Sequence, residues 1–349
     1  MCLEIIVKKN KDFIIHYVPG AKCLTDPPLS LTGLIKQRRR WFNGTMFASF
    51  HVLGSMCRVW KRKKSSFCRN ILFMFLYFYM ILTTALSYIL VGTFFAAFSI
   101  FIRGVLPSSN CPYDLQVANV IEIIYVVFLA GCLFLSITVT VDWAETGYRI
   151  FSLFMGCFSV LMGVATIMYA FEDDVAFFVL ILGAVWISTY ILPLLVNLQR
   201  LRFVDFVKGI LYTFYLSPTY VNIFTIFAIG NIHDVSWGSR PSTMDATQIA
   251  AASKKDVMYK NFRSNFLIIW IVINTSIAIA ITELSRNGEA QVISYIAIFM
   301  TFILFVKLAC SILHVIVTCW HLSMTKKYIR KCKSTVFKNV TEEMRQEGN

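Results

Sequence analysis

The run ILFMFLYFYMILTTALSYILVGTFFAAFSI, residues 71–100, decides the fold of this 349-residue chain. It is long and apolar enough for a membrane-spanning helix, because about 20 residues at about 1.5 Å each cross the ~30 Å hydrocarbon core of a bilayer. We therefore predict a mainly α fold, a polytopic helical membrane protein. Five similar runs give it six spans in all, the others lying near residues 117–140, 151–170, 175–197, 264–283 and 289–312.

The composition agrees with this prediction. Hydrophobic residues make up 57% of the chain, the mean hydropathy is +0.66 and the net charge is +14. The basic residues form short runs beside the apolar spans, which is typical of a membrane protein that meets anionic lipid or sugar phosphate, so no nucleic-acid partner is expected. Ten cysteines without a CxxC pair argue against a disulfide framework.

Charge predicts the orientation of the spans. A basic cluster at residues 58–64 precedes the first apolar run. Because short basic loops stay in the cytosol, the N-terminal side of this run is predicted to be cytosolic. The connection 104–116 then lies outside, and the basic stretch 199–202 lies in the cytosol again. The count predicts a multi-pass membrane protein with both termini cytosolic.

Residues 207–230 are also apolar enough to span, but a seventh span would place the basic loop that follows them outside. Ser217-Pro218 divides this segment. Proline removes a helical hydrogen bond and disfavours helix at the preceding residue. We predict that the segment folds back here as a re-entrant or interfacial hairpin, which keeps the next loop cytosolic. Seven spans are the alternative.

The first 69 residues are polar and basic. Phe13–Val18 is rich in β-branched and aromatic residues, which predicts a short strand. Ser30 predicts the N-cap of an amphipathic helix from about Leu31 to Arg58, lying at the membrane surface. The arginines of this helix are expected to face water or the mouth of an active site.

Two motifs stand out from the membrane pattern. Gln37-Arg38-Arg39-Arg40-Trp41 sets three guanidiniums, which bind phosphate bidentately, beside an aromatic face that stacks on rings and cations. A site for a sugar diphosphate needs both. The second motif is Asn231-Ile232-His233-Asp234-Val235-Ser236-Trp237-Gly238-Ser239-Arg240. The non-functional alternatives are a membrane anchor for the first motif and a polar loop for the second.

These motifs, with Tyr17-Val18-Pro19 and Thr25-Asp26-Pro27, resemble those of chitin synthases, which polymerise N-acetylglucosamine from its UDP-sugar. QxxRW is shared with cellulose and hyaluronan synthases, whereas HDVSWG is specific to the chitin synthases. The resemblance implies a loop near the nucleotide or acceptor that contains Asp234, Ser236, Trp237, Gly238 and Arg240. It also implies an acceptor and UDP site formed by Gln37, Arg38, Arg39, Arg40 and Trp41.

The resemblance gives each part of the chain an expected role. Residues 1–69 would end an α/β glycosyltransferase (GT-A) domain and carry the interfacial helix. Four transmembrane helices would occupy 70–200, the re-entrant segment and SWGS loop 201–263, two further transmembrane helices 264–320, and a basic cytosolic tail 321–349. The implied partners are UDP-N-acetylglucosamine, the nascent chitin chain and the lipid bilayer of the plasma membrane, and a homodimer is compatible with them.

The implied activity is hexosyl transfer to a growing β-1,4 chitin chain and translocation of that chain. In the family, an acidic motif with the catalytic base precedes the match to Cys2-Leu3-Glu4, and carboxylates for a divalent metal, Mg²⁺ or Mn²⁺, lie further upstream. The sequence contains neither, so it is expected to be the C-terminal half of a synthase, inactive alone, with no catalytic residue or metal ligand of its own. The alternatives are a non-catalytic membrane channel or transporter, and a regulatory partner derived from a truncated synthase.

Overall fold

The computed structural model describes residues 23, 26–56, 67–105, 114–169, 203–234 and 246–286, with isolated positions between 298 and 320. The chain divides into two compact units, one formed by Met1–Met168 with Leu211–Gly288 and one by Tyr169–Ile210 with Glu289–Asn349. Most of the described helices belong to the first unit. The predicted strand at 13–18 and the predicted span at 175–197 lie outside the described residues, and 289–312 is described only at isolated helical positions.

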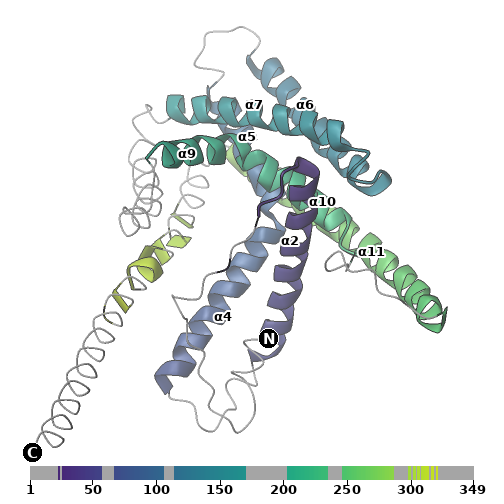
Figure 1. The fold of residues 1–349 in the computed structure, drawn as a ribbon. Helices are drawn as coiled ribbons and strands as arrows, with labels where there is room; N and C mark the ends of the chain where they lie inside the picture. Colours follow the sequence, from purple (N-terminus) through teal and green to yellow (C-terminus); the bar gives the residue numbers. More distant parts are fainter. Residues whose placement is uncertain are drawn as a thin grey trace, which may run out of the picture. The chain divides into compact units, whose positions relative to one another are not determined.

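Every regular element in the described ranges is a helix (Figure 1). Five of the helical stretches are long and apolar enough to cross a membrane, which confirms the mainly α membrane fold: Asn70–Tyr88, Leu115–Thr138, Glu145–Val164, Phe203–Gly230 and Val257–Ser285. The elements are α2 (Leu31–Gly54), α4 (Phe67–Tyr88), α5 (Leu90–Val105), α6 (Asp114–Thr138), α7 (Glu145–Tyr169), α9 (Phe203–Pro218), the π-helix η3 (Thr219–Phe224), α10 (Thr225–Gly230) and α11 (Ala246–Arg286).

Helix α2 begins where the sequence predicts. The Ser30 hydroxyl accepts a hydrogen bond from the Gly33 amide at 3.0 Å, so Ser30 is the N-cap. The helix ends at Gly54, four residues before the predicted end at Arg58. Its buried face is mostly polar, because it holds Thr32, Arg39, Asn43 and Ser49 as well as Ile35 and Met46.

The predicted span 71–100 is broken into α4 and α5 after Tyr88. Two side chains of α11 bond the carbonyl at the break: Trp270 Nε1 and Asn274 Nδ2 donate to Tyr88 O at 2.8 and 3.0 Å. Asn274 Oδ1 also accepts from the Gly92 amide at 2.9 Å. A Cβ atom on Gly92 would lie 2.3 Å from the Asn274 carbonyl oxygen, so the α5–α11 crossing requires glycine.

The predicted fold-back at Ser217-Pro218 is wrong, because α9, η3 and α10 continue one another as a single helical stretch. Proline cannot donate to the carbonyl four residues earlier, which here belongs to Phe214. The Ser159 hydroxyl of α7 donates to that carbonyl instead, at 2.6 Å. The wider turns of η3 follow the proline directly. A neighbouring helix thus replaces the bond that the prediction counted as lost.

The α9–α10 stretch runs antiparallel to α7 over the part that the first unit contains. The partners along the two helices succeed each other in opposite directions: Ser159 with Phe214, Ser152 with Thr219, and Tyr148 with Phe227. The chain therefore returns at Asp234 to the end at which α7 begins. An uninterrupted helix, not a hairpin, brings the second motif to this end.

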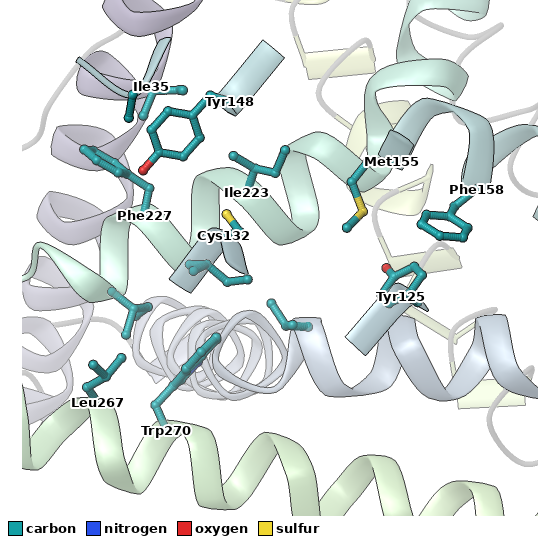
Figure 2. Packing of buried hydrophobic residues seen from close by; sticks show 14 of the residues in the cluster. Ile35, Tyr125, Cys132, Tyr148, Met155, Phe158, Ile223, Phe227, Leu267 and Trp270 are labelled. Atoms are coloured by element: carbon teal, nitrogen blue, oxygen red, sulfur yellow. The ribbon is translucent and has the colours of Figure 1, made fainter. Parts of the chain in front are cut away.

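The core of the first unit lies where α2, α5, α6, α7, η3, α10 and α11 meet (Figure 2). Aromatic rings fill one end, with Phe98 and Phe158 centred 4.8 and 4.9 Å from Tyr125. The Tyr125 hydroxyl accepts a hydrogen bond from Asn222 Nδ2 at 2.6 Å, so η3 is tied to α6 through a polar contact inside the apolar core.

We expect Ser159→Ala to lower the free energy of unfolding by about 0.5–1.5 kcal/mol, because it removes the side-chain donor to the part-buried Phe214 carbonyl. Chemical denaturation of the protein in detergent micelles measures this change. Ser264→Ala is the matched control, since the exposed Ser264 hydroxyl bonds only the Lys260 carbonyl of its own helix. Equal stability of the two variants would contradict the role of Ser159.

Candidate functional site

A cavity of about 370 Å³ lies between α2, α4 and the η3–α10 region. Arg38 and Trp41 of the first motif line it, together with Tyr220 of η3. Hydroxyl groups are frequent in its wall and come from three elements: Thr45, Ser49, Thr83, Thr84, Ser87 and Thr225. An aromatic face surrounded by hydroxyls and one guanidinium suits a sugar, which presents both an apolar ring face and several hydroxyl groups.

Arg38 is held between two aromatic rings. Its guanidinium carbon lies 4.9 Å from the ring centre of Trp41 and 5.3 Å from that of Tyr220. Both distances are within the range of a cation–π contact. Trp41 keeps 57% of its surface exposed, so part of the ring remains available to a ligand. The two aromatic side chains fix the direction in which the guanidinium can donate hydrogen bonds.

Arg39 does not face water or a site mouth, so that expectation is wrong for this arginine. Its side chain is 9% exposed and forms an ion pair with Asp234. This ion pair links the two motifs directly. Burial, and then the charge of Arg40, lower the pKa of the Arg39 guanidinium from its ordinary value. Arginine stays protonated nonetheless, which makes a carboxylate partner necessary.

The remaining predicted site residues either do not line the cavity or lie outside the described residues. Gln37 and Arg40 are half-buried on α2, and neither lines the cavity. Ser236, Trp237, Gly238 and Arg240 lie outside the described residues. The structure therefore brings together Arg38, Trp41, Arg39 and Asp234 out of the predicted set.

A second cavity of about 560 Å³ lies on the other side of Arg38, between α2, α7 and the α9–η3 helix. Arg38, Tyr220 and Phe224 line both cavities. Arg149 also lines the second cavity and forms an ion pair with Glu145 one turn earlier on α7. The stacked Arg38 side chain thus forms part of the wall between the two spaces.

The resemblance implies a divalent metal, but the described residues contain no cluster of side chains that could bind it. No three His, Cys, Asp or Glu side chains in the described ranges lie close enough together to hold a metal ion. Asp234, the acidic residue nearest to the first motif, is occupied by the Arg39 guanidinium. We therefore assign no metal-dependent step to these residues.

Comparison with known proteins agrees with the motifs. Residues 1–56 match the model of a chitin synthase-like glycosyltransferase domain. The chain is 26% identical over 288 residues to chitin synthase A of Ampelomyces quisqualis, and 27% identical over 263 residues to chitin synthase 1 of Saccharomyces cerevisiae. The chain is similar to the chitin synthases. The alignments cover 74% and 69% of this chain but only 30% and 22% of those relatives.

A third relative extends the match to chitin synthases along more of the chain. Chitin synthase 1 of Phytophthora sojae is 25% identical over 340 residues, which are 85% of this chain and 36% of that protein. The chain therefore spans about a third or less of the length of these chitin synthases. The likeness reaches well beyond the matched domain.

Sequence reasoning missed Tyr220 and the hydroxyl groups of α4 as parts of this candidate site. Thr83, Thr84 and Ser87 are clustered polar residues inside an apolar run, and that cluster was a usable indication. Tyr220 had no such indication, because it is one of many aromatic residues in the membrane helices. Only the packing of η3 against α2 places its ring on Arg38.

Proposed function

We propose that this chain forms the acceptor-side and membrane parts of a chitin synthase. The protein would transfer N-acetylglucosamine from UDP-N-acetylglucosamine to a growing β-1,4 chitin chain and move that chain across the membrane. The cavity beside Trp41 and Arg38 carries the proposal, since it combines a partly exposed indole with six hydroxyl-bearing side chains. The two motifs that resemble chitin synthases meet close to it through Arg39 and Asp234.

In the proposed reaction the 4-hydroxyl oxygen of the acceptor attacks the anomeric carbon of the donor sugar. The new glycosidic bond forms as the bond to the UDP oxygen breaks, and a carboxylate takes the proton of the hydroxyl. We assign neither that carboxylate nor the metal site to the described residues. Trp41 would stack on the terminal acceptor ring, and the hydroxyls of α2 and α4 would orient it by hydrogen bonds.

The membrane helices would provide the path for the product. A chitin chain is too polar to cross lipid unaided, so its exit must adjoin the site at which it grows. The cavity lies directly against α4, one of the helices able to span a membrane. We place the protein in the plasma membrane with its termini and active site in the cytosol, where the UDP-sugar is available.

Two rival functions make different predictions. A non-catalytic channel or transporter explains the membrane helices, but it requires neither a stacking tryptophan beside hydroxyls nor the two motifs. A regulatory partner derived from a synthase would keep both motifs and yet support no synthesis. Synthetic activity that depends on the native gene separates the channel or transporter from the proposal.

The test is incorporation of radiolabelled UDP-N-acetylglucosamine, with Mg²⁺, by membranes of cells that express the native gene. We expect an insoluble product that chitinase digests, and none above background in a strain with the gene disrupted. Equal incorporation by the two strains would refute the proposal. For the 349-residue chain expressed by itself we expect no incorporation, because its sequence lacks the family's acidic base and metal motifs.

A further inference from the structure

We propose that Arg39 is a positioning residue, which locks the start of the SWGS loop onto the helix that carries Gln37–Trp41 through its ion pair with Asp234. The resemblance assigns all three arginines of the motif to ligand binding. The structure separates them, because Arg38 lines both cavities whereas Arg39 lines neither. This inference rests on the proposed function for its effect on synthesis, but the contact itself is testable without activity.

The ion pair is part of a packed, hydrogen-bonded interface between α2 and α10. Asn43, one turn after Arg39 on the same buried face, donates a hydrogen bond to the Ala228 carbonyl at 3.2 Å. Every residue of α10 is buried. From the other side, Asn231 Nδ2 donates to the Ser136 carbonyl of α6 at 3.0 Å and to Phe227 O at 3.1 Å. The turn that leads to Asp234 is therefore held from two directions.

Electrostatics explains why a cation is needed at this place. Asp234 follows the C-terminal end of α10, where the carbonyl dipoles already create a negative potential. A second negative charge is unfavourable there unless a cation compensates it. The nearly buried Arg39 guanidinium compensates both the helix end and the carboxylate. Removal of the Asp234 carboxylate takes this compensation away from the Arg39 guanidinium, whose side chain is only 9% exposed.

The position of the pair in the sequence links it to both motifs. Trp41 follows Arg39 by two residues, and Trp237 follows Asp234 by three. The ion pair thus fixes the point from which each tryptophan-containing segment departs. Loss of the pair would release the start of the SWGS loop and leave the Trp41–Arg38 stack in place.

Chitin synthesis provides the first test, in membranes of cells that express the native gene or its variants. We expect Arg39→Gln and Asp234→Asn each to lower kcat about tenfold with little change of KM for UDP-N-acetylglucosamine, and the double variant to lose no more than either single one. Exchange of the charges, Arg39→Asp with Asp234→Arg, should recover part of the loss. Additive losses, or a raised KM in Arg39→Gln with normal activity in Asp234→Asn, would overturn the proposal in favour of direct ligand binding.

The second test needs no activity and uses the 349-residue chain in open membranes. A cysteine placed at Ser239, in a background without native cysteines, should react faster with a thiol reagent in Arg39→Gln and Asp234→Asn, and at the original rate after the charge exchange. Lys36→Gln is the matched control, since it removes an exposed ion pair of the same helix with Asp142. Unchanged labelling rates in both single variants would refute the lock even if the protein proves to be a synthase. If the Arg39→Gln protein fails to accumulate, the same labelling rates are compared in the single variants Asp234→Asn and Arg39→Lys.

Discussion

Trp41→Ala is expected to lower chitin synthesis by the native protein about 5- to 150-fold, which corresponds to the ~1–3 kcal/mol of a ring-stacking contact. The structure gives two reasons for so large an effect. The indole is one of the aromatic side chains that line the cavity, and it also contacts Arg38, whose guanidinium carbon lies 4.9 Å from the ring centre. The substitution removes the stacking face and also frees Arg38 on one side. Incorporation of radiolabelled sugar at matched expression measures the loss.

Trp143→Ala is the control for this experiment. Trp143 is 88% exposed in the turn between α6 and α7 and lines neither cavity. We expect this variant to keep normal activity, so that a loss specific to Trp41 cannot arise from removal of any surface tryptophan. Near-normal synthesis by Trp41→Ala would leave the first motif as a membrane anchor, the alternative that its basic charge allows.

A cysteine at Ser239 is expected to resist an impermeant thiol reagent on intact cells and to react fully after permeabilisation. Chemistry on a cytosolic UDP-sugar requires the SWGS loop to be in the cytosol. Two ion pairs of α2 support the cytosolic side. Arg39 pairs with Asp234. Lys36 Nζ lies 2.7 Å from a carboxylate oxygen of Asp142. Helix α2, the α6–α7 turn and the end of α10 therefore lie at the same end of the first unit.

The labelling experiment has a built-in positive control. In a protein without its other cysteines, Cys111 lies in the connection 104–116 that charge places outside, so it should react on intact cells. Labelling of Ser239→Cys on intact cells would establish the seven-span topology. It would also exclude the SWGS loop from the transfer reaction, because the loop would be separated by the membrane from the nucleotide sugar.

Local patterns in the sequence were sufficient for the class of fold. Apolar runs of membrane length predicted helices, and Ser30 predicted the beginning of α2, because hydropathy and capping depend on neighbouring residues. The position of the first motif on that helix followed in the same way. The sequence alone identifies Trp41 and Arg38 as candidate ligand residues, since their chemistry is a property of the side chains themselves.

Contacts between distant segments decided the rest. Pro218 predicts a break by local rules, but Ser159 of α7 bonds the carbonyl that the proline leaves open, and the helix continues. Residues 71–100 predict one helix, but Trp270 and Asn274 of α11 stabilise a break in it. In both cases the backbone polar groups cannot be left unbonded in an apolar surrounding, and a side chain far away in the sequence determines where they are satisfied.

The arginines of the first motif show the same division at the candidate site. The sequence by itself determined that three guanidiniums and an indole share one helix, and that a second polar motif follows later in the chain. Only the tertiary structure decided their roles, since the packing of η3 places Tyr220 on Arg38, and the packing of α10 buries Arg39 against Asp234. Adjacent residues on a helix point about 100° apart, so identical side chains met different neighbours and acquired different functions.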